Sequence, residues 1–395
     1  MLKKLIEILK SYTEDKLLLF LLVLMCLDSF GSLPFYLCLV FPFLIKKIEL
    51  SLDNYALLIL VFSLIYSLMA LLNGYFDRSY GSFIFFCLYP LFFYWVGKYF
   101  GTKTDFSLTN LLILIGISFA IMPILAVLRE ISQDQLINVT RLMTDENGIS
   151  MGAATIIGTK VSLVLSFMGV VFATNNDRYD ILIKLLLIVF SCLGIMTTLH
   201  LVNRTGLLVV AASLALSVII NRSSLKHYQL YILLLVIALF IYINRDFLEF
   251  MFSESTMAYQ ERAELGDTGG GRFKIWRQVV DIVTQNPAGV EHGFGIRKGF
   301  DYAHNIFLDI PLEAGILPLF LFVAIFIIHI KNLYNLYKAW TPNILLTLIF
   351  VMNVAFLIQL ISEPVMDGLM VYYFTFFLMI GICSTLSKRK MLMLH

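Results

Sequence analysis

The sequence is dominated by a succession of apolar runs that are long enough to cross a lipid bilayer as helices. A membrane-spanning helix needs about 20 mainly apolar residues, and fewer suffice in short hairpins. Twelve runs come close to this length, at residues 15–30, 33–45, 53–73, 82–97, 108–128, 152–173, 181–201, 206–220, 228–243, 306–330, 344–361 and 369–385. The first two runs are short and are separated only by Asp28-Ser29-Phe30-Gly31, so they form either two spans or one interrupted helix.

The composition supports the same interpretation. Of the 395 residues, 59% are hydrophobic and 14% are charged, whereas about 25% of residues are charged in soluble domains. A soluble core would leave much of this apolar excess in contact with water. The sequence therefore predicts an all-α polytopic membrane protein with about 12 transmembrane helices, in which residues 1–395 form a single transmembrane domain. It has no basic stripe typical of nucleic-acid binding, so we expect no nucleic-acid partner.

The distribution of Lys and Arg predicts the orientation in the membrane, because cytoplasmic loops carry an excess of these residues. If both termini are cytoplasmic, the inner segments contain seventeen Lys and Arg residues. The short outer loops then contain four, which are Arg78, Arg129, Arg141 and Arg204. Seven more lie in one long outer loop, and long loops contribute little to this rule. We therefore predict that both termini lie in the cytoplasm.

The long outer loop, residues 244–305, differs in character from the rest of the chain. It has 62 residues, of which nine are acidic and seven are basic. Within it, three glycines at 269–271 precede the segment RFKIWRQVVDIVTQNP, and Pro287 would end a helix there. Apolar residues recur in this segment at helical spacing, at Phe273, Trp276, Val279, Val280 and Val283. The pattern predicts an amphipathic helix that lies on the outer membrane surface or caps the helix bundle.

Three arginines at the predicted outer face are candidates for phosphate binding. Arg204 lies in a tight turn between two spans, and membrane-embedded charge is costly and usually functional. Arg272 lies in the first turn of the loop helix, where free backbone amides and the helix dipole favour anions, and a guanidinium adds bidentate phosphate geometry. Arg277 follows on the same helix. The alternatives are that Arg204 snorkels to lipid phosphates and that Arg272 and Arg277 are solvated surface residues.

His304 is the candidate for proton transfer. The run DYAHNIFLDIPLEAGIL places His304 and Asn305 where the polar loop enters an apolar helix. Histidine is the side chain best suited to accept or donate a proton near neutral pH. Asp301, Asp309 and Glu313 lie nearby in sequence, so their carboxylates could orient the imidazole or bind sugar hydroxyls. The alternative is that His304 merely caps its helix. We expect neither a metal ion nor another cofactor, since the sequence has no HExxH motif, clustered His and Cys, or phosphate-binding loop.

Three segments together resemble the bacterial O-antigen polymerase and O-antigen ligase superfamily over about residues 197–320. They are NRTGLL, GRFKIW, and NPAGVEHGFG followed by AHNIFLDIPLEAGIL. The resemblance implies a metal-independent, GT-C-like membrane glycosyltransferase in the bacterial inner membrane, with its active site on the periplasmic face. It also implies a glycan donor on undecaprenyl pyrophosphate. Arg204 and Arg272, with Arg277 as a third, would bind the pyrophosphate, and His304 would be catalytic, supported by Asn305 and Glu313.

The resemblance leaves the acceptor open. The direct passage from the loop into AHNIFLDIPLEAGIL is more similar to the polymerases, so we expect an O-antigen polymerase that adds glycan to another lipid-linked repeat unit. Such an enzyme would work with a chain-length-regulating protein. The alternative is an O-antigen ligase, whose acceptor is lipid A-core. A lipid-linked oligosaccharide flippase is a further alternative, but the intramembrane charges are few, at Asp28, Lys160, Glu363 and Asp367.

Overall fold

The structure is a computed structural model that describes residues 16–27, 50–76, 80–133, 142–144, 150–173, 178–201, 203–222, 270–294, 303–339, 341 and 343–392. Two of the twelve predicted spans, at residues 33–45 and 228–243, lie outside the described residues. The same holds for residues 244–269 of the long loop and for Asp301.

The described residues are almost entirely helical. After a short apolar helix at Lys16–Leu27, the helices are α3 (Asn54–Leu72), α4 (Tyr80–Gly101), α5 (Asp105–Ser132), α6 (Ala154–Ser166), the 3₁₀ helix η1 (Phe167–Phe172), α7 (Arg178–His200), α8 (Arg204–Asn221), α11 (Gly270–Gln285), α12 (Ile306–Ala314), α13 (Ile316–Ala339), α14 (Ile344–Ser362), α15 (Val365–Gly368) and α16 (Met370–Leu392). Two short antiparallel strands, β1 (Leu142–Thr144) and β2 (Ser150–Ala153), precede α6. Within the described ranges, nine segments are long and apolar enough to cross a bilayer, which confirms the predicted polytopic helical architecture.

One predicted span has a different form in the structure. The apolar run at 306–330 is not a single helix, because it is divided at Gly315 into α12 and α13. Gly315 has a φ of 87°, and a Cβ atom there would lie 2.6 Å from the carbonyl oxygen of Pro287. The amide of Ile316 donates to that same oxygen at 2.9 Å. Hydropathy alone could not reveal this break, since the apolar composition continues through it.

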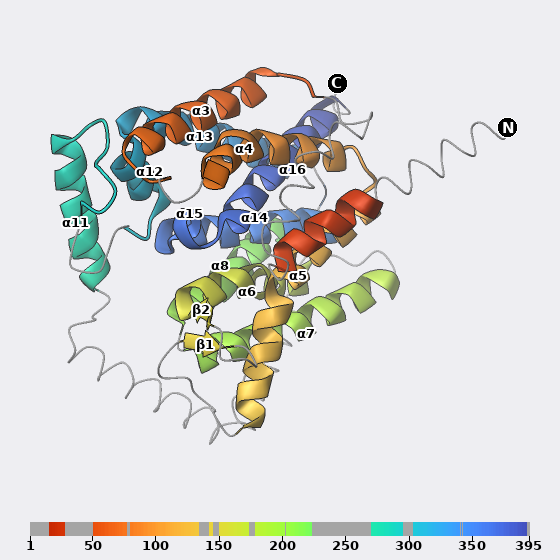
Figure 1. Ribbon diagram of the computed structural model, residues 1–395. Helices are drawn as coiled ribbons and strands as arrows, with labels where there is room; N and C mark the ends of the chain where they lie inside the picture. The colour runs from red at the N-terminus through yellow and green to blue at the C-terminus, as the bar shows by residue number, and fades with distance from the viewer. Residues whose placement is uncertain are drawn as a thin grey trace.

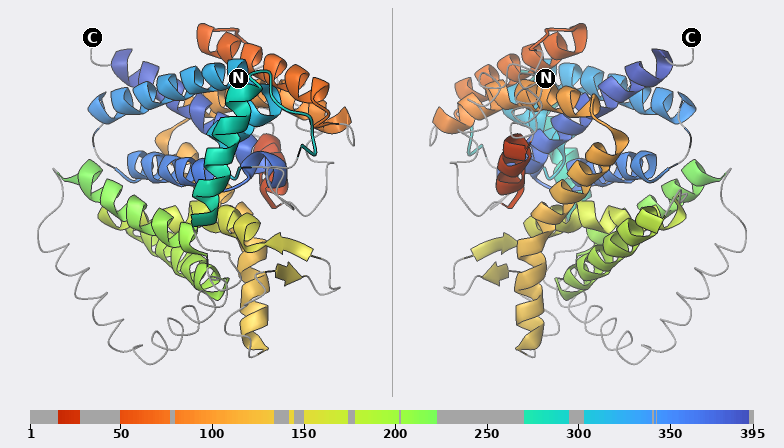
Figure 2. Two further views of the ribbon diagram at one scale, coloured as in Figure 1. Left: turned by 90° about the vertical axis from the view of Figure 1, so that its left-hand side faces the viewer. Right: turned by 90° about the vertical axis from the view of Figure 1, so that its right-hand side faces the viewer.

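The loop helix α11 has the predicted position in sequence and ends at Gln285, just before Pro287. It lies at the edge of the molecule beside α12, and it runs across the direction of α13 and α16 (Figures 1 and 2). Of its predicted apolar face, Val279 is buried, whereas Phe273 and Val280 are exposed. The helix therefore packs against one end of the bundle and also presents apolar side chains outward.

The two ends of the bundle differ in their charged groups. At one end, Asp53 caps α3 and pairs with Lys98 at 3.0 Å and with Lys388 at 3.5 Å. Arg389 pairs with Asp105 at 3.4 Å at the same end. The opposite end contains the start of α8, the end of α14, and the helices α11 and α12 (Figure 1). Lys98, Lys388 and Arg389, which the charge count assigns to the cytoplasm, thus share one end, and which end faces the cytoplasm stays a prediction.

Candidate functional site

The backbone around His304 is held in an unusual conformation by a buried carboxylate. His304 has a φ of 56°, which is the left-handed region that L-residues other than glycine seldom adopt. The two oxygens of Asp309 accept hydrogen bonds from the amides on either side of it, from Ala303 at 2.5 Å and from Asn305 at 3.0 Å. Asp309 is buried. Its carboxylate therefore holds the backbone of His304 in this left-handed conformation through two hydrogen bonds.

The helices on either side fix the same segment. Asn305 caps α12, and its side-chain oxygen accepts a hydrogen bond from the amide of Phe307 at 3.0 Å. Trp276, on α11, donates from Nε1 to the carbonyl oxygen of Ala303 at 2.9 Å. Behind this contact, α11 packs on α12 through a small apolar cluster of Ile275, Val279, Val290, Ala303 and Leu312. The loop helix therefore places the histidine as well as the arginine of its own first turn.

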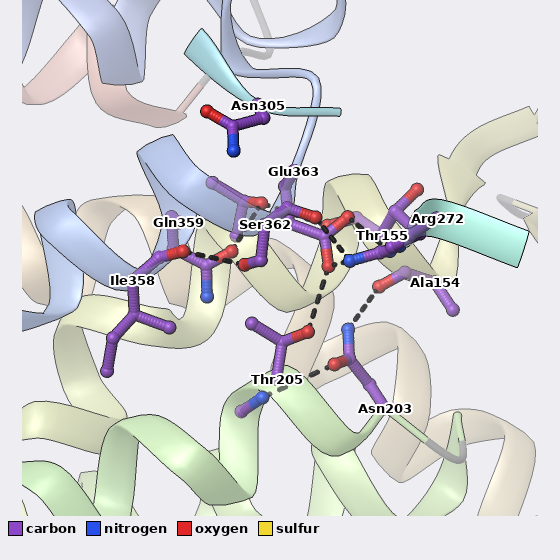
Figure 3. Close-up of polar contacts among 12 residues, drawn as sticks. Ala154, Thr155, Asn203, Thr205, Arg272, Asn305, Ile358, Gln359, Ser362 and Glu363 are labelled. Carbon is purple, nitrogen blue, oxygen red and sulfur yellow. Dashed lines mark hydrogen bonds and ion pairs between the residues drawn. The ribbon is translucent and has the colours of Figure 1, made fainter. Parts of the chain in front are cut away.

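That arginine, Arg272, reaches the end of α14. Its Nη1 donates to the carbonyl oxygen of Ser362, and its Nη2 lies 3.3 and 3.4 Å from the two carboxylate oxygens of Glu363 (Figure 3). The Glu363 side chain is 2% exposed, whereas that of Arg272 is 35% exposed. The guanidinium is thus anchored by two groups, while the Arg272 side chain stays partly exposed.

The start of α8 meets the same carboxylate. Thr205 donates from Oγ1 to Glu363 at 3.0 Å (Figure 3). Asn203 caps the helix, because its side-chain oxygen accepts from the amide of Gly206 at 3.3 Å, and its Nδ2 donates to the carbonyl oxygen of Ala154 at 2.8 Å. Arg204, the first residue of α8, is exposed beside Thr205. We call Arg272, Thr205, Ser362 and Glu363 the Glu363 cluster.

His304 lies within electrostatic reach of this cluster. Burial, and after it the positive charge of Arg272, lower the pKa of its imidazole to about 4. At neutral pH the imidazole is therefore neutral and able to accept a proton. The structure brings Arg272 and His304 together from positions 32 residues apart in the chain.

Other predicted site residues lie elsewhere. Arg277 is on the exposed face of α11, whereas Arg272 is on the side of this helix that packs against the bundle. Glu313 is buried and accepts a hydrogen bond from the hydroxyl of Tyr66, so this contact lies inside the bundle. The loop residue His292 is exposed, its amide donates to the carbonyl oxygen of Asn73, and its ring contacts that of Tyr75 in a tilted arrangement.

Three members of the Glu363 cluster, Thr205, Ser362 and Glu363, were not predicted as site residues. The sequence marks Glu363 as a charge at the end of an apolar run, and it gives no indication of a partner. Thr205 is a polar residue next to Arg204 and carries no signal of its own. Metal-site geometry, meaning three or more His, Cys, Asp or Glu side chains gathered together, is not found among the residues that the structure describes.

A comparison with protein families finds one match. Residues 185–323 match the family described as O-antigen ligase, which is about a third of the chain. The matched range contains Arg204, Arg272 and His304, and it ends before Glu363. A search of curated proteins finds no match.

Proposed function

From the match to the O-antigen ligase family, which supports membership of the O-antigen polymerase and ligase superfamily, we propose that the protein is a membrane glycosyltransferase. It transfers an oligosaccharide from undecaprenyl pyrophosphate to a hydroxyl group of a second glycan. The observation that carries this proposal is the proximity of the imidazole of His304, which is neutral at pH 7, to the partly exposed side chain of Arg272. A transfer from a pyrophosphate needs both a cation for the leaving group and a base for the acceptor.

Arg272 and the start of α8 would hold the pyrophosphate. The free amides of a helix N-terminus and its dipole favour anions, and Arg204 is exposed at the first position of α8. As the bond between the anomeric carbon and the pyrophosphate oxygen breaks, negative charge grows on the leaving group. Donors already in place stabilise that charge without reorganisation. This assigns binding and leaving-group stabilisation to the arginines.

His304 would act on the acceptor. The acceptor oxygen attacks the anomeric carbon on the face opposite the pyrophosphate, its proton passes to the imidazole, and the new glycosidic bond forms with inverted configuration. A low pKa keeps the imidazole unprotonated beside Arg272, which a base requires. Donor and acceptor both arrive tethered to lipid, so confinement to the membrane lowers the entropic cost of their meeting.

The chemistry of the acceptor distinguishes two forms of this function. The direct passage from the loop into AHNIFLDIPLEAGIL is more similar to the polymerases, and we therefore propose an O-antigen polymerase, working with a chain-length-regulating protein. The description of the matched family favours O-antigen ligase as the second candidate. A flippase is less consistent with that match, because the family description is that of an enzyme. The site would lie on the periplasmic face of the inner membrane.

A deletion strain separates these functions by its lipopolysaccharide pattern on a gel. Lipid A-core carrying a single repeat unit indicates a polymerase. Bare core with lipid-linked polymer retained in the membrane indicates a ligase. Retention of single repeat units on the cytoplasmic side indicates a flippase and would contradict the proposal.

Purified protein with a lipid-linked donor tests the catalytic residue. A general base contributes typically about 10²–10⁴-fold, so His304→Ala should nearly abolish product while protein yield and donor binding are kept. His304→Gln fills a similar space and can hydrogen-bond, but it cannot act as a base, so near-normal activity of this variant would reassign His304 to positioning. The matched control is His292→Ala in the same loop. An inactive His292→Ala beside an active His304→Ala would require a different base.

A further inference from the structure

The end of α14 holds a carboxylate in a place where elementary electrostatics disfavours it. Glu363 is the C-cap of α14, and the C-terminal end of a helix dipole repels negative charge. Its side chain is 2% exposed, and a buried charge is costly unless it is paired and hydrogen-bonded. The negative charge of Glu363 must therefore be stabilised by the donors around it, and the identity of those donors indicates the role of this residue.

The two side chains that bond to Glu363, Thr205 and Arg272, come from helices to which the proposed function assigns phosphate binding. Thr205 lies in the first turn of α8, 158 residues before Glu363 in sequence, and Arg272 lies in the first turn of α11, 91 residues before it. The positive end of the α8 dipole faces the carboxylate, which offsets the unfavourable position at the end of α14. Glu363 thus joins two helix starts that have no connection in the local sequence.

The contacts also fix the direction of the Arg272 side chain. Nη1 is held by the carbonyl oxygen of Ser362, and Nη2 is held by Glu363. A guanidinium has five N–H donors in a rigid fork, so anchoring two nitrogens on one side aims the remaining donors. Since 35% of the side chain is exposed, Arg272 stays accessible to a ligand while it is held next to the start of α8, which bonds to the same carboxylate.

We propose that Glu363 is a positioning residue that sets Arg272 and the first turn of α8 at a fixed spacing, so that both contact the donor pyrophosphate. This rests on the proposed glycosyl transfer and deepens it. Glu363 acts through Arg272 and Thr205, and it takes no part in bond making or breaking. The carboxylate is needed as a charged acceptor for two donors at once, which neither an amide nor an apolar side chain provides.

The test is steady-state kinetics of Glu363→Gln with the full-length protein and a lipid-linked donor. The amide has no charge and turns an NH₂ group toward one of the two donors, so Arg272 and Thr205 are held less firmly and Arg272 keeps only its bond to the carbonyl oxygen of Ser362 at full strength. Misplacement of a binding group by about 1 Å can cost on the order of 10²-fold. We expect kcat/KM for the donor to fall by about this factor per folded molecule, with a raised donor KM, and Glu363→Asp to recover part of it.

A double-mutant cycle separates positioning from a merely structural role. If Glu363 acts partly through Arg272, then Glu363→Gln should lower kcat/KM by a clearly smaller factor in the Arg272→Lys background than in the wild-type protein. Additive losses would overturn the proposal. The matched control is Asp53→Asn, which removes a paired carboxylate at the opposite end of the bundle. It should leave kcat/KM near the wild-type value and be additive with Arg272→Lys.

Two further outcomes keep the proposal distinct from the function on which it rests. Wild-type activity in Glu363→Gln, or a lowered donor KM as expected if the carboxylate competes with phosphate, overturns the positioning role while His304→Ala stays inactive. Absence of transfer by the wild-type protein instead overturns the function. If Glu363→Gln does not fold, Thr205→Val removes the 3.0 Å hydrogen bond and leaves the ion pair in place. It should raise the donor KM several-fold, and an unchanged KM would refute the link to α8.

Discussion

The clamp that Asp309 places on the backbone of His304 gives a prediction that can be worked from the structure. In Asp309→Asn, the amide keeps one oxygen acceptor and directs its NH₂ group toward the second backbone N–H. One of the two hydrogen bonds, from Ala303 at 2.5 Å and from Asn305 at 3.0 Å, is therefore lost, and the other loses its charge assistance. The side chain of His304 itself is unchanged.

The magnitude follows from the opposing terms. Hydrogen bonds to a charged group contribute about 1.5–3 kcal/mol each, whereas the left-handed conformation of His304 costs about 1–2 kcal/mol. The wild-type clamp thus favours the observed backbone by about 3 kcal/mol. In the variant, the one remaining hydrogen bond is neutral and contributes about 1 kcal/mol. It is opposed by the unchanged backbone strain at His304 and by the buried backbone N–H that has lost its acceptor, which costs about 1–3 kcal/mol. The balance moves against the observed conformation by about 2 kcal/mol, so roughly one molecule in 30 would keep it, at 1.4 kcal/mol per factor of ten.

The assay is transfer by purified protein from a lipid-linked donor, with kcat and donor KM measured separately. We expect kcat to fall by about 10- to 100-fold, because His304 is misdirected, while the donor KM is little changed, because the Glu363 cluster is intact. Asp281→Asn, on the exposed face of α11, is the matched control and should behave as wild type. A kcat within twofold of wild type for Asp309→Asn would refute the reasoning that the clamp sets the catalytic geometry.

Three other predictions follow from the same geometry. Because the pKa of His304 is lowered to about 4, kcat/KM of the wild-type protein should stay constant as the pH falls below 6.5 and should drop near pH 4. Arg272→Gln removes the nearby positive charge and should move this drop to higher pH. A drop near pH 6.5 in the wild-type protein would contradict the assignment of His304 as the base. The folded protein should also lose stability as the pH falls from about 6.5 to 4, since the His304 imidazole of the unfolded chain is protonated in this range before that of the folded protein. Arg272→Lys keeps the charge but loses the bidentate fork, so activity should fall markedly at unchanged membrane abundance, whereas Arg222→Lys, at the far end of α8, should not. In a background without native cysteines, an impermeant thiol reagent should label Thr284→Cys in spheroplasts and Thr102→Cys only after permeabilisation; the reverse pattern would overturn the topology.

The spans and the loop helix could be predicted because each depends on local composition. A backbone inside lipid must satisfy its own hydrogen bonds, so an apolar run of sufficient length becomes a helix wherever it lies. The same physics hides how the helices pack, since lipid-facing and protein-facing sides are both apolar. Thus 28% of the α13 span is buried against 72% of the α14 span, although both are strongly apolar. The break at Gly315 likewise depends on the carbonyl oxygen of Pro287.

The candidate site divides in the same way. The sequence by itself determined that His304 and Arg272 lie at a boundary between polar loop and apolar helix, because residue type and position along the chain are enough to indicate proton transfer and phosphate binding. Tertiary structure alone decided the partners of the nearby carboxylates. Asp309 accepts hydrogen bonds from backbone amides, Glu313 accepts one from Tyr66, and Glu363 forms an ion pair with Arg272. These pairings join residues on different helices, and a buried charge is stabilised by whatever partner the packing brings within hydrogen-bonding distance, which no local pattern specifies.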